Sequence, residues 1–132
     1  MVDFEKTRLR RFSAIEMKLE RMQKLMKALG NPHNSVRCVH VAGTNGKGSV
    51  SHMVDTMMRG VGYTVGRYTS PHLTDVRERI SVGGVEIDKT AFGEVITKVA
   101  EASKSVDLEP TFFEAMTAAA FVHFESEAVD LA

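Results

Sequence analysis

The stretch His40-Val-Ala-Gly-Thr-Asn-Gly-Lys-Gly-Ser-Val50 is the most informative part of this sequence. It places three glycines, a lysine and a serine between a short apolar run, Val36 to Val41, and a segment with helical periodicity. Glycines let a backbone turn tightly and bring its N–H groups close to an anion. A helix N-terminus adds partial positive charge. The stretch therefore predicts a phosphate-binding loop in an α/β fold.

The loop departs twice from the standard spacing G-x-x-x-x-G-K-[ST]. Ala42 stands where the first glycine belongs, and Gly48 separates Lys47 from Ser49. The strand, loop and helix context still favours nucleotide binding over a glycine-rich turn with an incidental lysine. Lys47 is then the catalytic charge stabiliser at the outer phosphates, and the Ser49 hydroxyl binds phosphate or a metal ion. The other residues assigned to the nucleotide are Gly43, Thr44, Asn45, Gly46 and Gly48.

Hydrophobic spacing predicts the remaining elements. Tyr63 to Tyr68 is typical of a second strand, which makes a βαβ unit with a parallel strand pair. Gly83-Gly84 predicts a hairpin over Arg79 to Ile87. Asp88 or Thr90 is expected to cap the helix that follows. Four helices are predicted from these apolar residues: Phe12, Ile15, Leu19, Met22, Met26 and Leu29; Val50, Met53, Val54, Met57 and Met58; Phe92, Val95, Ile96 and Val99; and Phe113, Met116, Ala120 and Phe124.

These elements predict one domain over residues 1–132, with an N-terminal helical segment (1–35) and a P-loop-type α/β core (36–132) whose parallel sheet is flanked by helices. The composition is that of an ordinary globular protein, 43% hydrophobic and 26% charged. Because 17 basic residues balance 17 acidic ones, a nucleic-acid partner is not expected. No apolar run approaches membrane-spanning length, and the charged N-terminus is not expected to be a secretion signal. The one cysteine, Cys38, is interpreted as a buried residue, and we expect a soluble cytoplasmic protein with no membrane partner.

The loop Gly43-Thr-Asn-Gly-Lys-Gly-Ser49 resembles that of the folylpolyglutamate synthase and dihydrofolate synthase branch of the Mur ligase superfamily. Cell-wall Mur ligases usually carry a threonine at the position of Gly48. More of the resemblance follows in order along the chain, at Leu29-Gly-Asn-Pro32, Tyr68-Thr-Ser-Pro-His-Leu73, Glu78-Arg-Ile80 and Thr111-Phe-Phe-Glu114.

The resemblance implies an ATP-dependent amide ligase. ATP phosphorylates a carboxylate of folate or dihydropteroate, and the amine of L-glutamate then attacks the acyl phosphate. Two alternatives stay open at this point. The chain is part of another Mur-type ligase for cell-wall precursors, or it is a non-catalytic nucleotide-binding remnant.

The resemblance also assigns residues outside the glycine loop. Ser70, with Ser49, is implied to bind Mg²⁺, although Mg²⁺ normally requires a carboxylate and a serine before Pro71 also suits a plain turn. His72, Thr111 and Phe113 are implied to contact the substrate. The alternatives are a surface position for His72 and core packing for Phe113.

Three charged residues near these segments have two interpretations each. Thr111-x-x-Glu114 is a capping box, which explains Glu114 better than a catalytic or metal-binding role does. Arg77 and Arg79 either meet a glutamyl carboxylate or lie in a solvated loop.

The last five residues, Ala128 to Ala132, are typical of the opening of a third strand. In the family this strand continues to an acidic metal ligand, and a C-terminal domain follows. We therefore expect the N-terminal part of a longer ligase, truncated before its sheet is complete. We also expect the isolated chain to bind nucleotide weakly and not to ligate.

Overall fold

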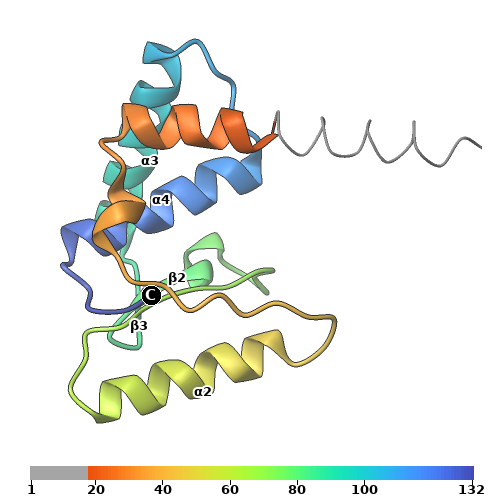
Figure 1. Cartoon of the computed structure of the whole chain (residues 1–132), viewed down its shortest axis with the longest axis vertical. Coiled ribbons are helices and arrows are strands. Elements are labelled where there is room, and N and C mark those ends of the chain that lie inside the picture. Colours follow the sequence, from red (N-terminus) through yellow and green to blue (C-terminus); the bar gives the residue numbers. More distant parts are fainter. Residues whose placement is uncertain (1–17) are drawn as a thin grey trace, which may run out of the picture.

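The computed structural model describes residues 18–132, so Phe12 and Ile15 of the first predicted helix lie outside the described part. Helices and short strands alternate, which confirms a mixed α/β architecture (Figure 1). Within residues 18–132, no helix is both long and apolar enough to cross a membrane. The described elements are a helix over residues 18–28, η1 (Pro32–Ser35), α2 (Lys47–Gly60), β1 (Gly66–Tyr68), η2 (Val76–Arg79), β2 (Ile80–Val82), β3 (Val85–Glu86), α3 (Lys89–Ser105) and α4 (Phe112–Ser126).

The three named strands form one antiparallel sheet in the order β1-β2-β3. Tyr68 pairs with Ile80 at one end of the first pair, and Val82 pairs with Val85 across the hairpin. Gly83 and Gly84 have φ angles of 61° and 82°, the left-handed geometry that a two-residue hairpin turn requires. The predicted hairpin is confirmed.

The parallel pair predicted from residues 36–41 and 63–68 is not a pair of neighbouring segments. Residues 130–132 lie between these two segments. The Val39 N–H donates to the Ala132 carbonyl (2.8 Å), and the Gly66 N–H donates to the Leu131 carbonyl (2.8 Å). Val65 and Leu131 form an isolated parallel bridge. Residues 36–41 belong to none of the strands β1 to β3. Their few hydrogen bonds to Ala132 do not make a continuous ladder.

The core lies between the helices and the inner face of the sheet. In Figure 1, α2 lies on one side of the strands and α4 on the other, with α3 and the N-terminal helix beyond α4. Leu25, Ile80 and Met116 are fully buried there. At Gly66 an added Cβ would lie 2.5 Å from Phe124 Cδ1, so the glycine is what lets α4 approach β1 this closely.

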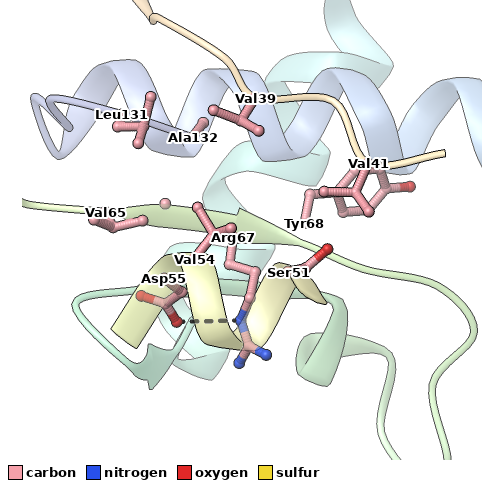
Figure 2. Close-up of a pocket in the computed structure, with 11 residues that line it drawn as sticks. Val39, Val41, Ser51, Val54, Asp55, Val65, Arg67, Tyr68, Leu131 and Ala132 are labelled. Atoms are coloured by element: carbon pink, nitrogen blue, oxygen red, sulfur yellow. Dashed lines mark ion pairs between the residues drawn. The ribbon is translucent and has the colours of Figure 1, made fainter. Parts of the chain in front are cut away.

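Helix α2 departs from its predicted packing. Val50, Met53 and Met57 are exposed, and the buried residue of the helix is Asp55, at 2% exposure. Asp55 Oδ1 accepts from Arg59 Nε at 2.7 Å. Asp55 Oδ2 faces Arg67 Nε at 3.3 Å without a well-aligned hydrogen bond (Figure 2). The inward face of α2 is therefore anchored by an ionic cluster that the apolar pattern did not predict.

Cys38 also differs from its predicted environment. It is exposed, as are residues 37–40 together, so no described element covers this part of the extended segment. Partial desolvation raises the pKa of its thiol.

Candidate functional site

The glycine loop ends where α2 begins. Gly43 and Gly46 have φ angles of 150° and 78°, which other residues rarely adopt, and Gly46 is the N-cap of α2. No side chain among residues 18–132 caps this helix. The first N–H groups of an α-helix have no intrahelical acceptor. Here they stay available to an anion.

Lys47 bends back over the same loop. Its ammonium Nζ donates to the Gly43 carbonyl at 2.6 Å, although the side chain is exposed. A positive charge therefore lies beside the uncapped helix N-terminus, an arrangement that suits a phosphate.

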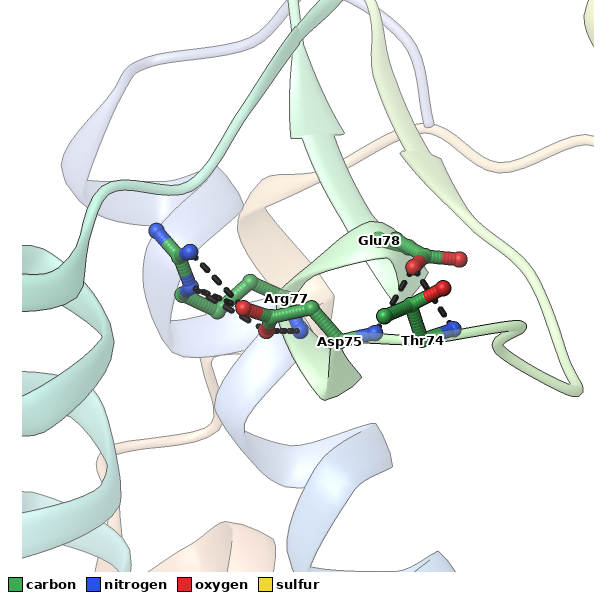
Figure 3. A network of polar contacts seen from close by, with 4 residues as sticks. All are labelled: Thr74, Asp75, Arg77 and Glu78. Carbon is green, nitrogen blue, oxygen red and sulfur yellow. Dashed lines mark hydrogen bonds and ion pairs between the residues drawn. The ribbon is translucent and has the colours of Figure 1, made fainter.

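The second candidate loop, residues 70–79, is held by carboxylates. Glu78 accepts backbone N–H groups from Leu73 (2.9 Å), Thr74 (2.9 Å) and Asp75 (2.7 Å). Asp75 caps η2 and accepts from the guanidinium of Arg77, with the shortest contact at 2.8 Å. Figure 3 shows this network, in which both carboxylates point into the loop they organise.

These contacts set the ionisation of the loop. The hydrogen bond from Arg77 lowers the pKa of Asp75 to about 2. Backbone N–H groups lower the pKa of Glu78, and Asp75 raises the pKa of Arg77. Arg77 is thus already paired with Asp75 within its own loop.

Ser70 and His72 lie in this same loop. Ser70 is exposed and precedes a cis bond to Pro71. His72 is half-buried, and its Nδ1 accepts a hydrogen bond from Arg79 Nε at 2.8 Å. His72 is therefore not a freely rotating surface side chain, since its ring has a defined partner.

The start of α4 carries the third group of predicted residues. The Glu114 N–H donates to Thr111 Oγ1 (3.2 Å), and the Thr111 N–H donates to Glu114 Oε2 (2.9 Å), so the predicted capping box is confirmed. Burial alone would raise the pKa of Glu114, but the Thr111 N–H and Arg21, at 3.3 Å, outweigh it and lower the pKa. Phe113 is 59% exposed, so its interpretation as a core residue is wrong.

The described residues do not by themselves make a metal centre. Residues 18–132 contain no group of three or more histidine, cysteine, aspartate or glutamate side chains that could hold a metal ion. Ser49 and Ser70, the two predicted Mg²⁺ ligands, offer neutral hydroxyls, whereas Mg²⁺ in proteins normally takes at least one carboxylate. The cavity between α2 and the strands, lined in part by Val41, Ser51 and Asp55, contains none of the predicted site residues (Figure 2).

No protein-family model matches the chain. The similar proteins described next, found by sequence and by structure, all carry the name folylpolyglutamate synthase. A probable bifunctional folylpolyglutamate synthase/dihydropteroate synthase of Haloferax volcanii is 45% identical over 127 residues, covering 94% of this chain and 15% of that protein. A dihydrofolate synthase/folylpolyglutamate synthase of Bacillus subtilis is 42% identical over 110 residues, covering 80% and 26%. The chain belongs to the folylpolyglutamate synthase/dihydrofolate synthase family.

A solved structure of this family also has a fold similar to that of this chain. Folylpolyglutamate synthase of Mycobacterium tuberculosis, solved in complex with ADP and AMPPCP, has a TM-score of 0.83 and 36% identity, covering 86% of this chain and 27% of that chain. The chain spans 15% to 27% of the lengths of these three proteins.

Neither a role for Phe112 itself nor its contact with Arg79 was predicted from the sequence. Phe112 is 58% exposed beside Phe113, and the guanidinium of Arg79 lies 5.2 Å from the centre of its ring. Arg79 thereby links the loop that carries His72 to the start of α4. No spacing rule connects these positions, because the contact is made by tertiary packing.

Proposed function

We propose that this chain is the nucleotide-binding part of an ATP-dependent ligase that adds L-glutamate to folate or dihydropteroate. The observation that carries the proposal is the uncapped N-terminus of α2, with Lys47 folded over the glycine loop. In the proposed reaction, a substrate carboxylate oxygen attacks the γ-phosphorus of ATP and ADP leaves. The glutamate amine then attacks the acyl carbon, the amide bond forms, and phosphate leaves with the former carboxylate oxygen.

The glycine loop would supply the electrostatic stabilisation that this reaction needs. The backbone N–H groups at the start of α2 would bind phosphate oxygens, with Gly43, Thr44, Asn45, Gly46, Gly48 and Ser49 shaping the cradle. Lys47 would stabilise the charge that spreads over the transferred phosphoryl group. Because the loop is pre-formed, little reorganisation is needed when the nucleotide binds.

Mg²⁺ is expected to accompany ATP as a Lewis acid at the phosphates. Ser49 and Ser70 would contribute hydroxyl oxygens, but the described residues do not suffice for a complete site. Nucleotide phosphate oxygens, water and a carboxylate would have to complete the shell.

The substrate side is proposed to lie at His72 and the start of α4. The exposed rings of Phe112 and Phe113 suit a planar heterocycle, and Thr111 lies directly before them. The parallel bonds of residues 130–132 would then belong to a P-loop-type sheet, in a single domain of which 1–35 is the helical segment. We propose a cytoplasmic enzyme whose further domain lies outside this sequence.

The proposal is tested by titrating the 132-residue chain with ATP and with ADP while following backbone amide signals by NMR. We expect the signals of residues 43–49 to shift most, with weak affinity. A chain that binds neither nucleotide contradicts the proposed phosphate loop. Glutamate-dependent phosphate release from this chain alone would instead contradict its expected inactivity.

A second titration identifies the ligase class. Dihydropteroate and folate are compared with a muramyl nucleotide, each at saturating ATP. Shifts at His72 and Phe113 with the pteridines alone support the folate branch. Shifts with the muramyl nucleotide alone would assign the chain to a cell-wall ligase instead.

A further inference from the structure

We propose that Arg79 is a positioning residue that holds His72 as an Nε2–H donor and Phe112 as an aromatic surface, so that a pteridine substrate's acceptor oxygen meets His72. This inference rests on the proposed function and deepens it at the substrate side. Three features of Arg79 carry it: its burial without a carboxylate, its bond to His72, and its contact with Phe112.

The burial of Arg79 is unusual for its charge. The residue is 9% exposed, yet among residues 18–132 no carboxylate forms an ion pair with it. Its neighbour Arg77 is bound by Asp75. Burying a guanidinium without a counter-charge is unfavourable unless its other contacts compensate. The contacts that Arg79 makes are therefore informative about what it is there to hold.

The bond to His72 determines the tautomer of the ring. Arg79 Nε and His72 Nδ1 are 2.8 Å apart. A guanidinium carries only donors, so Nδ1 must be the acceptor and the ring proton must sit on Nε2. His72 therefore offers a donor to a bound ligand and selects an acceptor oxygen over an amino group.

Arg79 holds the chain on both sides of the Ser70-Pro71 bond. Its side chain binds His72, and its carbonyl accepts from the Thr69 N–H at 3.0 Å. The chain on either side of the exposed Ser70 is thus held by the same residue that orients His72.

The contact with Phe112 connects this loop to α4. The guanidinium carbon lies 5.2 Å from the ring centre, within cation–π range. Phe112 is nevertheless 58% exposed, so part of the ring stays open to a ligand. Arg79 thus contacts both His72 and Phe112, which come from two distant parts of the sequence, and Phe112 directly precedes the predicted substrate residue Phe113.

The first experiment needs no substrate. Nitrogen-15 spectra of the imidazole rings are recorded for the ligand-free chain and for the Arg79→Met, Arg79→Lys and Arg37→Met variants. We expect the wild type and the exposed control Arg37→Met to show His72 protonated at Nε2 with a hydrogen-bonded Nδ1. Arg79→Met should lose the Nδ1 hydrogen-bond signature while the backbone spectrum stays folded, and Arg79→Lys should retain part of it. An unchanged Nδ1 signal in Arg79→Met would overturn the proposal.

The second experiment measures dihydropteroate affinity for the same variants. Loss of one oriented donor should weaken binding by Arg79→Met about tenfold, with partial rescue by Arg79→Lys and no change in Arg37→Met. Equal affinity of Arg79→Met and wild type would overturn the role of Arg79 in substrate binding. If even the wild type fails to bind dihydropteroate, the proposed function fails, while the ring-nitrogen spectra still decide whether Arg79 orients His72.

Discussion

The two candidate loops are built in opposite ways. The glycine loop, residues 43–49, takes its shape from backbone angles and the start of α2, with one side-chain bond from Lys47 back to Gly43. The loop over residues 70–79 is held by Asp75 and Glu78, whose carboxylates accept N–H groups along the chain. Within the described part of the chain, the glycine loop leaves its backbone donors free, whereas the loop over residues 70–79 satisfies its own internally.

This difference matches the tasks proposed for the loops. A phosphate cradle needs unpaired N–H groups, so a side-chain cap on α2 would compete with the nucleotide. A surface that orients His72 and Ser70 needs fixed directions before the substrate arrives, and internal carboxylates provide that order. The comparison predicts that a bound nucleotide will protect the backbone amides of the glycine loop from hydrogen exchange more than those of residues 70–79.

The largest expected effect comes from Lys47→Ala. Removing a charge-assisted contact to phosphate should weaken ATP binding by the chain between about tenfold and a hundredfold. The free energy of unfolding should change by no more than about 0.5 kcal/mol, because the side chain is exposed and bonds only within its own loop. Isothermal titration and denaturant unfolding measure the two quantities.

Lys98→Ala is the matched control for this prediction. Lys98 is an exposed lysine of α3, so its removal changes the net charge equally and should leave ATP affinity unaltered. Equal losses in both variants would mean that the loop binds nucleotide through net charge alone.

The second prediction separates the loops by Glu78→Ala. Because three backbone N–H groups lose their acceptor, amide hydrogen exchange at Leu73, Thr74 and Asp75 should accelerate on the order of tenfold. Exchange in residues 43–49 should not change. Glu86→Ala, an exposed position on β3, is the control. Acceleration in both loops would show that they are one cooperative unit.

Acid should open the second loop before it affects the first. The pKa of Asp75 falls from its ordinary 3.8 to about 2 in the folded chain. A lowered carboxyl pKa stabilises the fold above the unfolded value, and this stability is lost as pH falls through the folded value. The loop should therefore loosen between pH 3.8 and about 2. The Asp75 carboxyl carbon shift reports it, and Arg77→Met should move the transition to higher pH.

Sequence reasoning succeeded where the determinants are local. The hairpin turn at Gly83-Gly84 and the helix caps at Asp88 and Thr111 follow from the chemistry of a few adjacent residues, and the structure contains all three. The end of the helix over residues 18–28 is also set locally, since Gly30 and Asn31 both have positive φ.

The failures concern contacts between distant segments. Periodicity placed the apolar residues of α2 inward but could not show that Asp55 would be buried by pairing with Arg67 of β1. Strand order was missed because adjacency of residues 37–39 to Ala132 depends on the whole sheet. At the site, the glycine loop was recognisable from composition, whereas the link from Arg79 to Phe112 exists only after folding.

A matched pair of substitutions in the glycine loop includes the smallest expected effect, that of Gly48→Ala. Gly46→Ala places a Cβ at φ 78° and should destabilise the chain by about 1 to 2 kcal/mol. Gly48→Ala lies in the first turn of α2 with nothing within 4 Å of the new Cβ, and should stabilise the chain by about 0.5 kcal/mol. Denaturant unfolding measures both changes. Opposite signs would confirm that backbone geometry shapes this loop. Equal and small changes would mean that the left-handed turn at Gly46 is not required, and that the two loops differ less than their hydrogen bonds imply.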